Sequence, residues 1–203
     1  MNKYIFEAKS KEEAITKALE ELNTTEENLV IKLLEEKSTL LKKIAKIEVI
    51  KYNDITSYLK TIINNILKEM GIEANLEIKK REDKISVEIF SDNNSILIGK
   101  NGKNIQALQL LLRQILNNKV RKQINLTVDV ENYREKRDKN LEFLAKKVAR
   151  EVSRTKVETK LDSMNSYERR VIHNALSNNK YVYTESTGEE PNRCIVIKPK
   201  EAE

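Results

Sequence analysis

The spacing of apolar residues divides the chain into three consecutive groups of helices and strands. In the first group, a strand pattern at residues 4–6 precedes a helix whose apolar face is Ala14, Ala18, Leu19 and Leu22. Ser10 and Glu13 are spaced as a capping box at the start of that helix. Two strand patterns follow, at 29–34 and 44–50. The pattern therefore predicts a β-α-β-β unit, whose size lies near the lower limit for independent folding.

The second group combines long helical periods with short alternating runs. A helical face over residues 54–70 stops at Gly71, and alternation at 74–79 and 85–90 then predicts two strands. A short helix, a long helix and a strand at 124–130 complete the order α-β-β-α-α-β. The apolar stripe of the long helix comprises Ile105, Leu108, Leu111, Leu112, Ile115 and Leu116. Residues 52–54 are the only candidate linker before this group.

The third group begins with a helix from residue 132 to about 154. Its predicted inward residues are Leu141, Leu144, Ala145, Val148, Ala149 and Val152, and its outer face carries Lys146, Lys147, Arg150 and Arg154. A short strand at 157–161 precedes a second helix, where Asn165 and Glu168 are spaced as a capping box, and strands at 181–185 and 194–197 follow. We therefore predict an α+β protein of three small α/β modules in tandem: 1–52, 53–130 and 131–203.

Composition favours a highly charged, soluble protein. Charged residues make up 34% of the chain, and no apolar run approaches the roughly 18 residues that a membrane-spanning helix needs. The first residues lack the apolar centre of a signal peptide. Cys194 is the single cysteine, so an internal disulfide is impossible and we expect a cytoplasmic location.

The net charge of +6 is unevenly distributed. Residues 1–53 balance 10 Lys against 10 acidic residues, whereas residues 54–130 and 131–203 each carry a net +3. The last segment also holds seven of the ten arginines, the side chain best suited to phosphate forks and base stacking. The imbalance favours nucleic-acid contact by the second and third modules, although an ordinary solvated surface accounts for it nearly as well.

A glycine-containing loop stands directly before the long helix of the second module. Two of the chain's four glycines, Gly99 and Gly102, lie in it with the spacing Gly-x-x-Gly. A side-chain-free turn that opens a helix lets a sugar-phosphate backbone approach exposed N–H groups, and Lys100 and Lys103 add positive charge. The candidate RNA-binding residues are Ile98, Gly99, Lys100, Asn101, Gly102, Lys103 and Ile105.

Gly-x-x-Gly alone is also common in ordinary turns, so its surroundings matter. Between the second and third helices of an α-β-β-α-α-β module, this loop resembles that of a KH domain of the prokaryotic type. KH domains clamp about four nucleotides with it. Ile98, Ile105 and either Val87 or Ile89 would form the floor of the groove. No aromatic residue stands beside the loop, so we expect modest affinity and loose sequence preference.

The third module contains the motif Arg169-x-x-x-His173. Residues four apart lie one turn above each other on a helix, so these two could clamp a phosphate, with Arg170 and Arg193 nearby. An ordinary polar helix surface has the same spacing and remains an alternative. His173 is the only histidine, and no cysteine pair or G-x-S-x-G accompanies it. We therefore expect no catalytic residues, no metal site and no cofactor.

The segments 164–173 and 188–197 look like the single-stranded nucleic-acid-binding domain named for its Arg-xxx-His motif. With the other two modules, the whole chain resembles the bacterial Jag family (also called KhpB or EloR). The resemblance implies a cytoplasmic RNA-binding protein that acts with a small single-KH partner in control of cell elongation, division or the envelope. It also implies an association with the membrane protein insertase. In many relatives the tip of the first module is rich in glycine and phenylalanine. The corresponding residues 37–44 lack both, which weakens the expectation of a protein partner bound through that tip.

Our hypothesis is a non-enzymatic regulator that binds single-stranded RNA, either as a monomer or as a homodimer. One rival is an adaptor whose first module docks membrane-insertion or cell-wall machinery, with RNA binding secondary. Leu40 and Leu41 would then be a docking tip, although a tucked-in loop is equally compatible. A second rival, a nuclease, lacks any metal-ligand spacing in the sequence.

Overall fold

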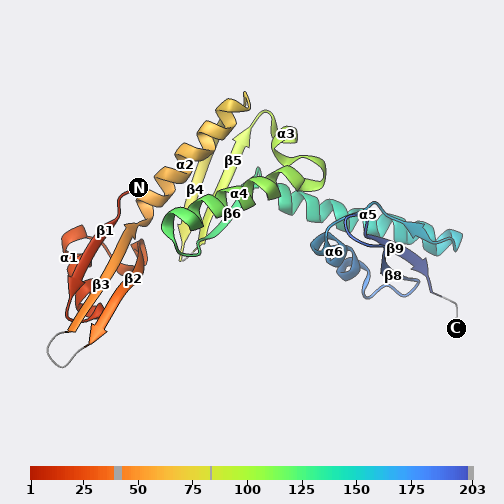
Figure 1. Cartoon of the computed structure of the whole chain (residues 1–203). Helices are drawn as coiled ribbons and strands as arrows, with labels where there is room; N and C mark the ends of the chain where they lie inside the picture. Colours follow the sequence, from red (N-terminus) through yellow and green to blue (C-terminus); the bar gives the residue numbers. More distant parts are fainter. Residues whose placement is uncertain (39–42, 83, 201–203) are drawn as a thin grey trace. The chain divides into compact units, whose positions relative to one another are not determined.

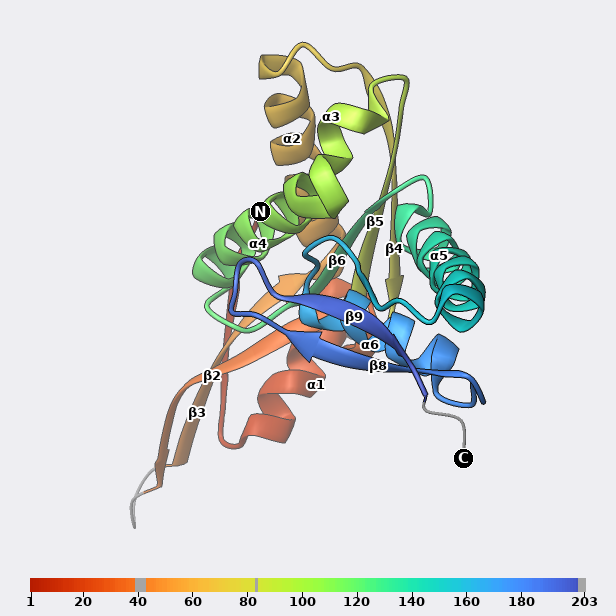
Figure 2. The same cartoon turned by 90° about the vertical axis from the view of Figure 1, so that its right-hand side faces the viewer.

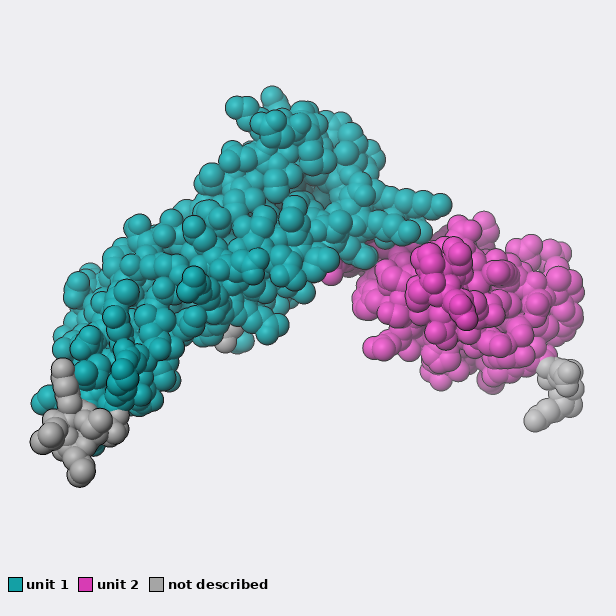
Figure 3. All heavy atoms as spheres, viewed as in Figure 1, with its two compact units in different colours: residues 1–131 teal, residues 132–203 magenta. Residues whose placement is uncertain are grey.

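A computed structural model describes residues 1–38, 43–82 and 84–200 of the chain. These residues form two compact units, Met1–Glu131 and Asn132–Glu203, coloured separately in Figure 3. Both units combine small sheets with helices, which confirms the predicted α+β class and the order of the elements in all three modules.

The first module is a small antiparallel sheet covered by one helix. Its elements are β1 (Tyr4–Ala8), α1 (Lys11–Leu22), a 3₁₀ turn η1 (Glu26–Asn28), β2 (Leu29–Ser38) and β3 (Lys43–Lys51), in the sheet order β1-β3-β2. Figure 2 shows α1 beside this sheet. The buried residues are Phe6, Ala14, Ala18, Leu29, Ile47 and Val49. Leu40 and Leu41 lie outside the described residues.

The second module has the predicted order α-β-β-α-α-β (Figure 1). Its elements are α2 (Tyr52–Glu69), β4 (Ala74–Arg81), β5 (Lys84–Ser91), α3 (Asn94–Ile98), a 3₁₀ turn η2 (Lys100–Gly102), α4 (Lys103–Val120) and β6 (Asn125–Val130). Strand β5 pairs antiparallel with β4 and parallel with β6. The parallel pairing requires the crossover that α3 and α4 supply, and this crossover carries the Gly-x-x-Gly loop.

The first and second modules share a core. Val30 of β2 and Ile50 of β3 belong to the same buried cluster as Tyr52 and the helices of the second module. Helix α2 begins at Tyr52, immediately after β3 ends at Lys51. The prediction of a linker at residues 52–54 is therefore wrong, because these residues form the first turn of α2.

The second unit places two helices against a three-stranded sheet. Its elements are α5 (Tyr133–Thr155), β7 (Thr159–Lys160), α6 (Ser166–Leu176), β8 (Val182–Thr187) and β9 (Cys194–Pro199), with sheet order β7-β9-β8. The core comprises Leu141, Ala145, Val148, Ala149, Val152, Met164, Ile172, Leu176, Val182, Ile195 and Ile197. Leu144 was predicted to face inward, but it is 39% exposed because it sits at the edge of the apolar stripe of α5.

Within the part of the chain that the structure describes, no helix combines the length and apolar character needed to cross a membrane.

Candidate nucleic-acid interface

The Gly-x-x-Gly loop adopts a backbone that side chains would hinder. Gly99 has φ +68° and ψ −178°, a conformation used almost only by glycine, and Gly102 has φ +74°. Asn101 between them is left-handed at φ +53°, which asparagine tolerates better than most residues. The two glycines therefore let the chain turn sharply just before α4.

The loop carries cations without acidic partners. The Lys100 and Lys103 side chains are exposed, and neither forms an ion pair with any residue in the described ranges. Ile98 is half-buried and packs against the core, whereas Ile105 is only 2% exposed and belongs to the core itself. Ile105 therefore supports the loop from below, and of these two apolar flanks only Ile98 reaches the surface.

Asn104 fixes the loop from the first turn of α4. Its side-chain Nδ2 donates to the Ile96 carbonyl at 2.8 Å, and the Gly99 N–H donates to the Ser95 carbonyl at 2.9 Å. A Cβ placed on Gly99 would lie 2.5 Å from Asn104 Cγ. Glycine at position 99 is thus required both by its backbone angles and by the amide packed against it.

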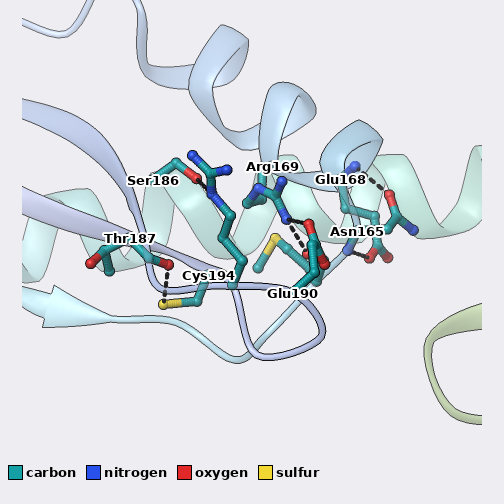
Figure 4. Close-up of polar contacts among 9 residues, drawn as sticks. Asn165, Glu168, Arg169, Ser186, Thr187, Glu190 and Cys194 are labelled. Atoms are coloured by element: carbon teal, nitrogen blue, oxygen red, sulfur yellow. Dashed lines mark hydrogen bonds and ion pairs between the residues drawn. The ribbon is translucent and has the colours of Figure 1, made fainter.

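In the second unit, Arg169 is turned into the domain rather than toward solvent. It is 9% exposed, and its Nη1 donates to the Met164 carbonyl and to Glu190 Oε1, both at 2.8 Å. Figure 4 shows the Arg169 and Glu190 side chains directed toward each other. Glu190 lies in the loop between β8 and β9, so Arg169 connects α6 to that loop.

His173 and Arg193 both contact strand β8. His173 Nδ1 lies 2.7 Å from Thr184 Oγ1, and Arg193 Nε donates to Ser186 Oγ at 3.0 Å. Thr184 and Ser186 are two residues apart on one strand, so their side chains point to the same face. The two cation-forming side chains are thereby placed next to each other, and both are exposed.

Arg170 does not belong to this arrangement. It is exposed on α6 and makes no hydrogen bond or ion pair with the residues described. Of the four candidates in this module, the structure therefore places His173 and Arg193 on a shared strand, whereas Arg169 is buried against Glu190 and does not form the predicted exposed clamp with His173.

The start of α6 is fixed by a capping box and by two contacts with α5. Asn165 Oδ1 accepts from the Glu168 N–H at 2.9 Å, and Glu168 accepts in return from the Asn165 N–H at 3.3 Å, as predicted. The buried Glu168 carboxylate also pairs with Arg137 Nε at 2.7 Å. The Tyr167 hydroxyl donates to Asp138 at 2.6 Å, and this bond raises the pKa of Tyr167. These contacts hold α6 at a defined rotation.

Sequence reasoning missed Asn104, Thr184, Ser186 and Glu190. Thr184 and Ser186 gave a weak signal. They are polar, yet they alternate with the same period as the buried Val182 and so lie on the same face of β8. Asn104 and Glu190 gave none, because their partners depend on backbone geometry that the sequence does not reveal. In the described ranges, no group of three or more His, Cys, Asp or Glu side chains could hold a metal ion.

The folds and loops of the two units define a class, namely proteins with tandem nucleic-acid-binding modules. The chain matches the family models for the Jag N-terminus over residues 6–51 and for the KH domain of KhpA and KhpB over 56–130. Over residues 139–199 it matches the model for the domain named for its Arg-xxx-His motif.

Two similar curated proteins carry the same name. The chain is 38% identical over 201 residues to the RNA-binding protein KhpB of Clostridium symbiosum, an alignment covering 95% of this chain and 90% of that protein. It is 32% identical over 196 residues to the RNA-binding protein KhpB of Bacillus subtilis, covering 93% and 94% of the two chains. The chain therefore belongs to the Jag/KhpB family.

Proposed function

We propose that the chain is a non-enzymatic regulator that binds single-stranded RNA at two places. The first is the loop at Gly99–Lys103, and the second is the face formed by His173 and Arg193. The relatives are named RNA-binding proteins, and two of the three matched models, the KH domain and the Arg-xxx-His domain, belong to nucleic-acid-binding families.

The observation that carries the proposal is the loop itself. Gly99 and Gly102 give the loop its sharp turn without side chains at those two positions, and Lys100 and Lys103 supply two cations that no described residue neutralises. Phosphates favour such a place, because the positive end of the α4 dipole and two ammonium groups act on it together.

Arg169 has a different role in this proposal. Since Arg169 is buried and bound to Glu190, it acts by positioning the β8–β9 loop that carries Arg193. His173 and Arg193 are the groups that would touch phosphate. Two weak sites in one chain bind a strand more tightly than either alone, provided that the strand spans both.

The test reverses the charge of the loop and leaves its glycines in place. The double variant Lys100→Asp with Asn101→Asp replaces one cation by two carboxylates, and aspartate tolerates the left-handed backbone at position 101. We expect at least a tenfold loss of affinity for mixed-sequence single-stranded RNA in filter binding. The control, Lys60→Asp with Asn65→Asp, makes the same charge change at exposed positions of α2. Equal affinities of the loop variant and the control would refute the proposal.

A second test concerns the face in the second unit. Replacing His173 and Arg193 together by glutamine removes the exposed cation-forming groups and leaves the Arg169–Glu190 pair intact. We expect weaker RNA binding and a smaller dependence of log K on log salt, by about 0.7 for each phosphate that is no longer bound. A wild-type salt slope in this variant would exclude the face from RNA contact.

The resemblance also suggests a cytoplasmic location, a small KH-domain partner and a role in cell elongation or envelope biogenesis. One observation favours the adaptor alternative: Ile5, Leu33 and Leu34 are exposed on the first module, whose net charge is zero. A pull-down after RNase treatment separates the two functions. Partners that remain bound through residues 1–51 favour an adaptor, and partners released with the RNA favour the RNA-binding regulator.

A further inference from the structure

Helix α5 carries a basic stripe on the side opposite its core. The helix buries Leu141, Ala145, Val148, Ala149 and Val152. At 100° per residue, the direction pointing away from these side chains is occupied by Phe143, Lys147, Arg150 and Arg154. All four are exposed, and Phe143 is 71% exposed. We refer to these four residues as the α5 stripe.

The charges of the α5 stripe are not neutralised within the domain. In the described ranges, the side chains of Lys147, Arg150 and Arg154 form no ion pair or hydrogen bond. Other cations of the same unit are paired: Arg137 with Glu168, Arg169 with Glu190, and Lys198 with Glu185. The stripe shares its lack of ion pairs with Arg170 of α6, and it differs by placing three such cations and an exposed aromatic ring on one helix face.

Like charges one helical turn apart lower the stability of the folded chain. Arg150 and Arg154 are separated by four residues, as are Lys146 and Arg150, and each such pair costs about 0.2–0.5 kcal/mol in an isolated helix. The acidic residues Glu142 and Glu151 lie toward the flanks of the helix and form no ion pair with the stripe. Glu151 lies four residues after Lys147 and three before Arg154, and opposite charges at these spacings offset the repulsion by a similar amount. The cations of the stripe remain exposed and without an ion-pair partner among the described residues, so a polyanion can reach them.

The chemistry of the stripe fits a phosphodiester backbone better than a lipid surface. A membrane-surface helix buries a broad apolar face in the lipid, but the apolar stripe of α5 is occupied by its own core. The exposed cations are mainly arginines, which form paired hydrogen bonds with phosphate. An exposed aromatic ring beside cations also suits base stacking on a single strand.

We infer that the α5 stripe is an additional RNA-contact surface, at which Lys147, Arg150 and Arg154 bind phosphates and Phe143 stacks on a base. The inference rests on the proposed RNA-binding function. The α5 stripe shares no residue with the Gly99–Lys103 loop or with the His173–Arg193 face. From Lys147 to Arg154 the cations extend about 10 Å along the helix, so they would follow a strand rather than hold one phosphate.

The experiment neutralises the stripe in the full chain. The variant Lys147→Gln, Arg150→Gln and Arg154→Gln keeps good helix formers at exposed positions. If each cation binds one phosphate of a single strand, the slope of log K against log salt falls by about 2, and affinity falls by up to about 50-fold at 0.15 M salt. The control, Lys11→Gln, Lys60→Gln and Lys68→Gln, removes the same charge from exposed positions of α1 and α2.

Phe143 provides an independent readout. Phe143→Ala should weaken RNA binding by about tenfold because stacking is removed, and it should leave the salt slope unchanged. Phe143→Tyr keeps an aromatic face and should retain wild-type affinity. This pattern separates a base contact from a general loss of charge or fold.

The outcomes divide clearly. A reduced slope in the stripe variant with a wild-type slope in the control supports the inference. Wild-type RNA binding by the stripe variant, alongside abolished binding by the Lys100→Asp and Asn101→Asp variant, overturns this inference and leaves the proposed function standing. Equal losses in stripe variant and control assign the effect to net charge and also overturn it. A wild-type chain that binds no RNA refutes both proposals. An acidic protein that binds the wild-type chain and the control but not the stripe variant would make the stripe a protein contact, and this too overturns the inference.

Discussion

Replacing Gly99 by alanine tests whether the loop is built as described. The backbone at Gly99, with φ +68° and ψ −178°, strains any other residue by about 1–3 kcal/mol. The added Cβ would also lie 2.5 Å from Asn104 Cγ, so the amide must move and release the Ile96 carbonyl. Losing that hydrogen bond costs about 1 kcal/mol. We therefore expect Gly99→Ala to lower the free energy of unfolding by about 2–4 kcal/mol.

Two further variants separate the strain from the contact. Gly71 has the same φ of +68°, but a Cβ added there would meet nothing within 4 Å, so Gly71→Ala should cost only about 1–2 kcal/mol. Asn104→Ala alone should cost about 1 kcal/mol. When Asn104→Ala is added to Gly99→Ala, the free energy of unfolding should fall almost no further, because the hydrogen bond to the Ile96 carbonyl is already broken.

Urea unfolding followed by the amide NMR signals of β5 and β6 measures these differences in the module concerned. With an m-value of about 1–3 kcal/mol per molar urea, Gly99→Ala should lower the midpoint by about 1–2 M. Two results would refute the reasoning: a Gly99→Ala midpoint equal to that of Gly71→Ala, or an Asn104→Ala cost that is the same in both backgrounds.

Two predictions concern the second unit, and urea unfolding followed by signals of β9 checks both. Arg169→Met should lower the free energy of unfolding by about 1–3 kcal/mol, because the Met164 carbonyl loses its donor. Glu190→Gln should lower it by less than about 1 kcal/mol, since the Glu190 side chain is 60% exposed. Equal losses in Arg169→Met and Glu190→Gln would contradict this account. Arg137→Met should cost about 2 kcal/mol by leaving the buried Glu168 carboxylate without its cation. Adding Glu168→Gln should recover much of that loss, and a fully additive double variant would argue against the pair.

The sequence predicted helices and strands well where one face of the element is buried, because apolar residues then recur with the period of a helix or a strand. The alternation of β5 and the period of α2 match their observed burial. Prediction from the sequence failed at the margins of helical stripes. Leu111 and Leu144 have helical spacing, yet they are 49% and 39% exposed, because the width of a buried stripe depends on which neighbouring element covers its edge. It also failed at residues 52–54, where α2 follows β3 without a linker.

The candidate sites were predictable as motifs but not as contacts. Two glycines and two lysines located the loop, and the structure adds the amide of Asn104 that fixes it. The four-residue spacing of Arg169 and His173 predicted a shared helix face. It could not predict that Arg169 is buried, because Glu190 lies 21 residues away and reaches it only through the β8–β9 loop.

The central claim is that the Gly-x-x-Gly loop contacts RNA directly, and an NMR titration of the full chain with single-stranded RNA tests it most directly. We predict that the amide resonances of Gly99–Lys103 shift progressively and saturate with the RNA. Unchanged resonances across this loop in a titration where RNA is bound would contradict the account.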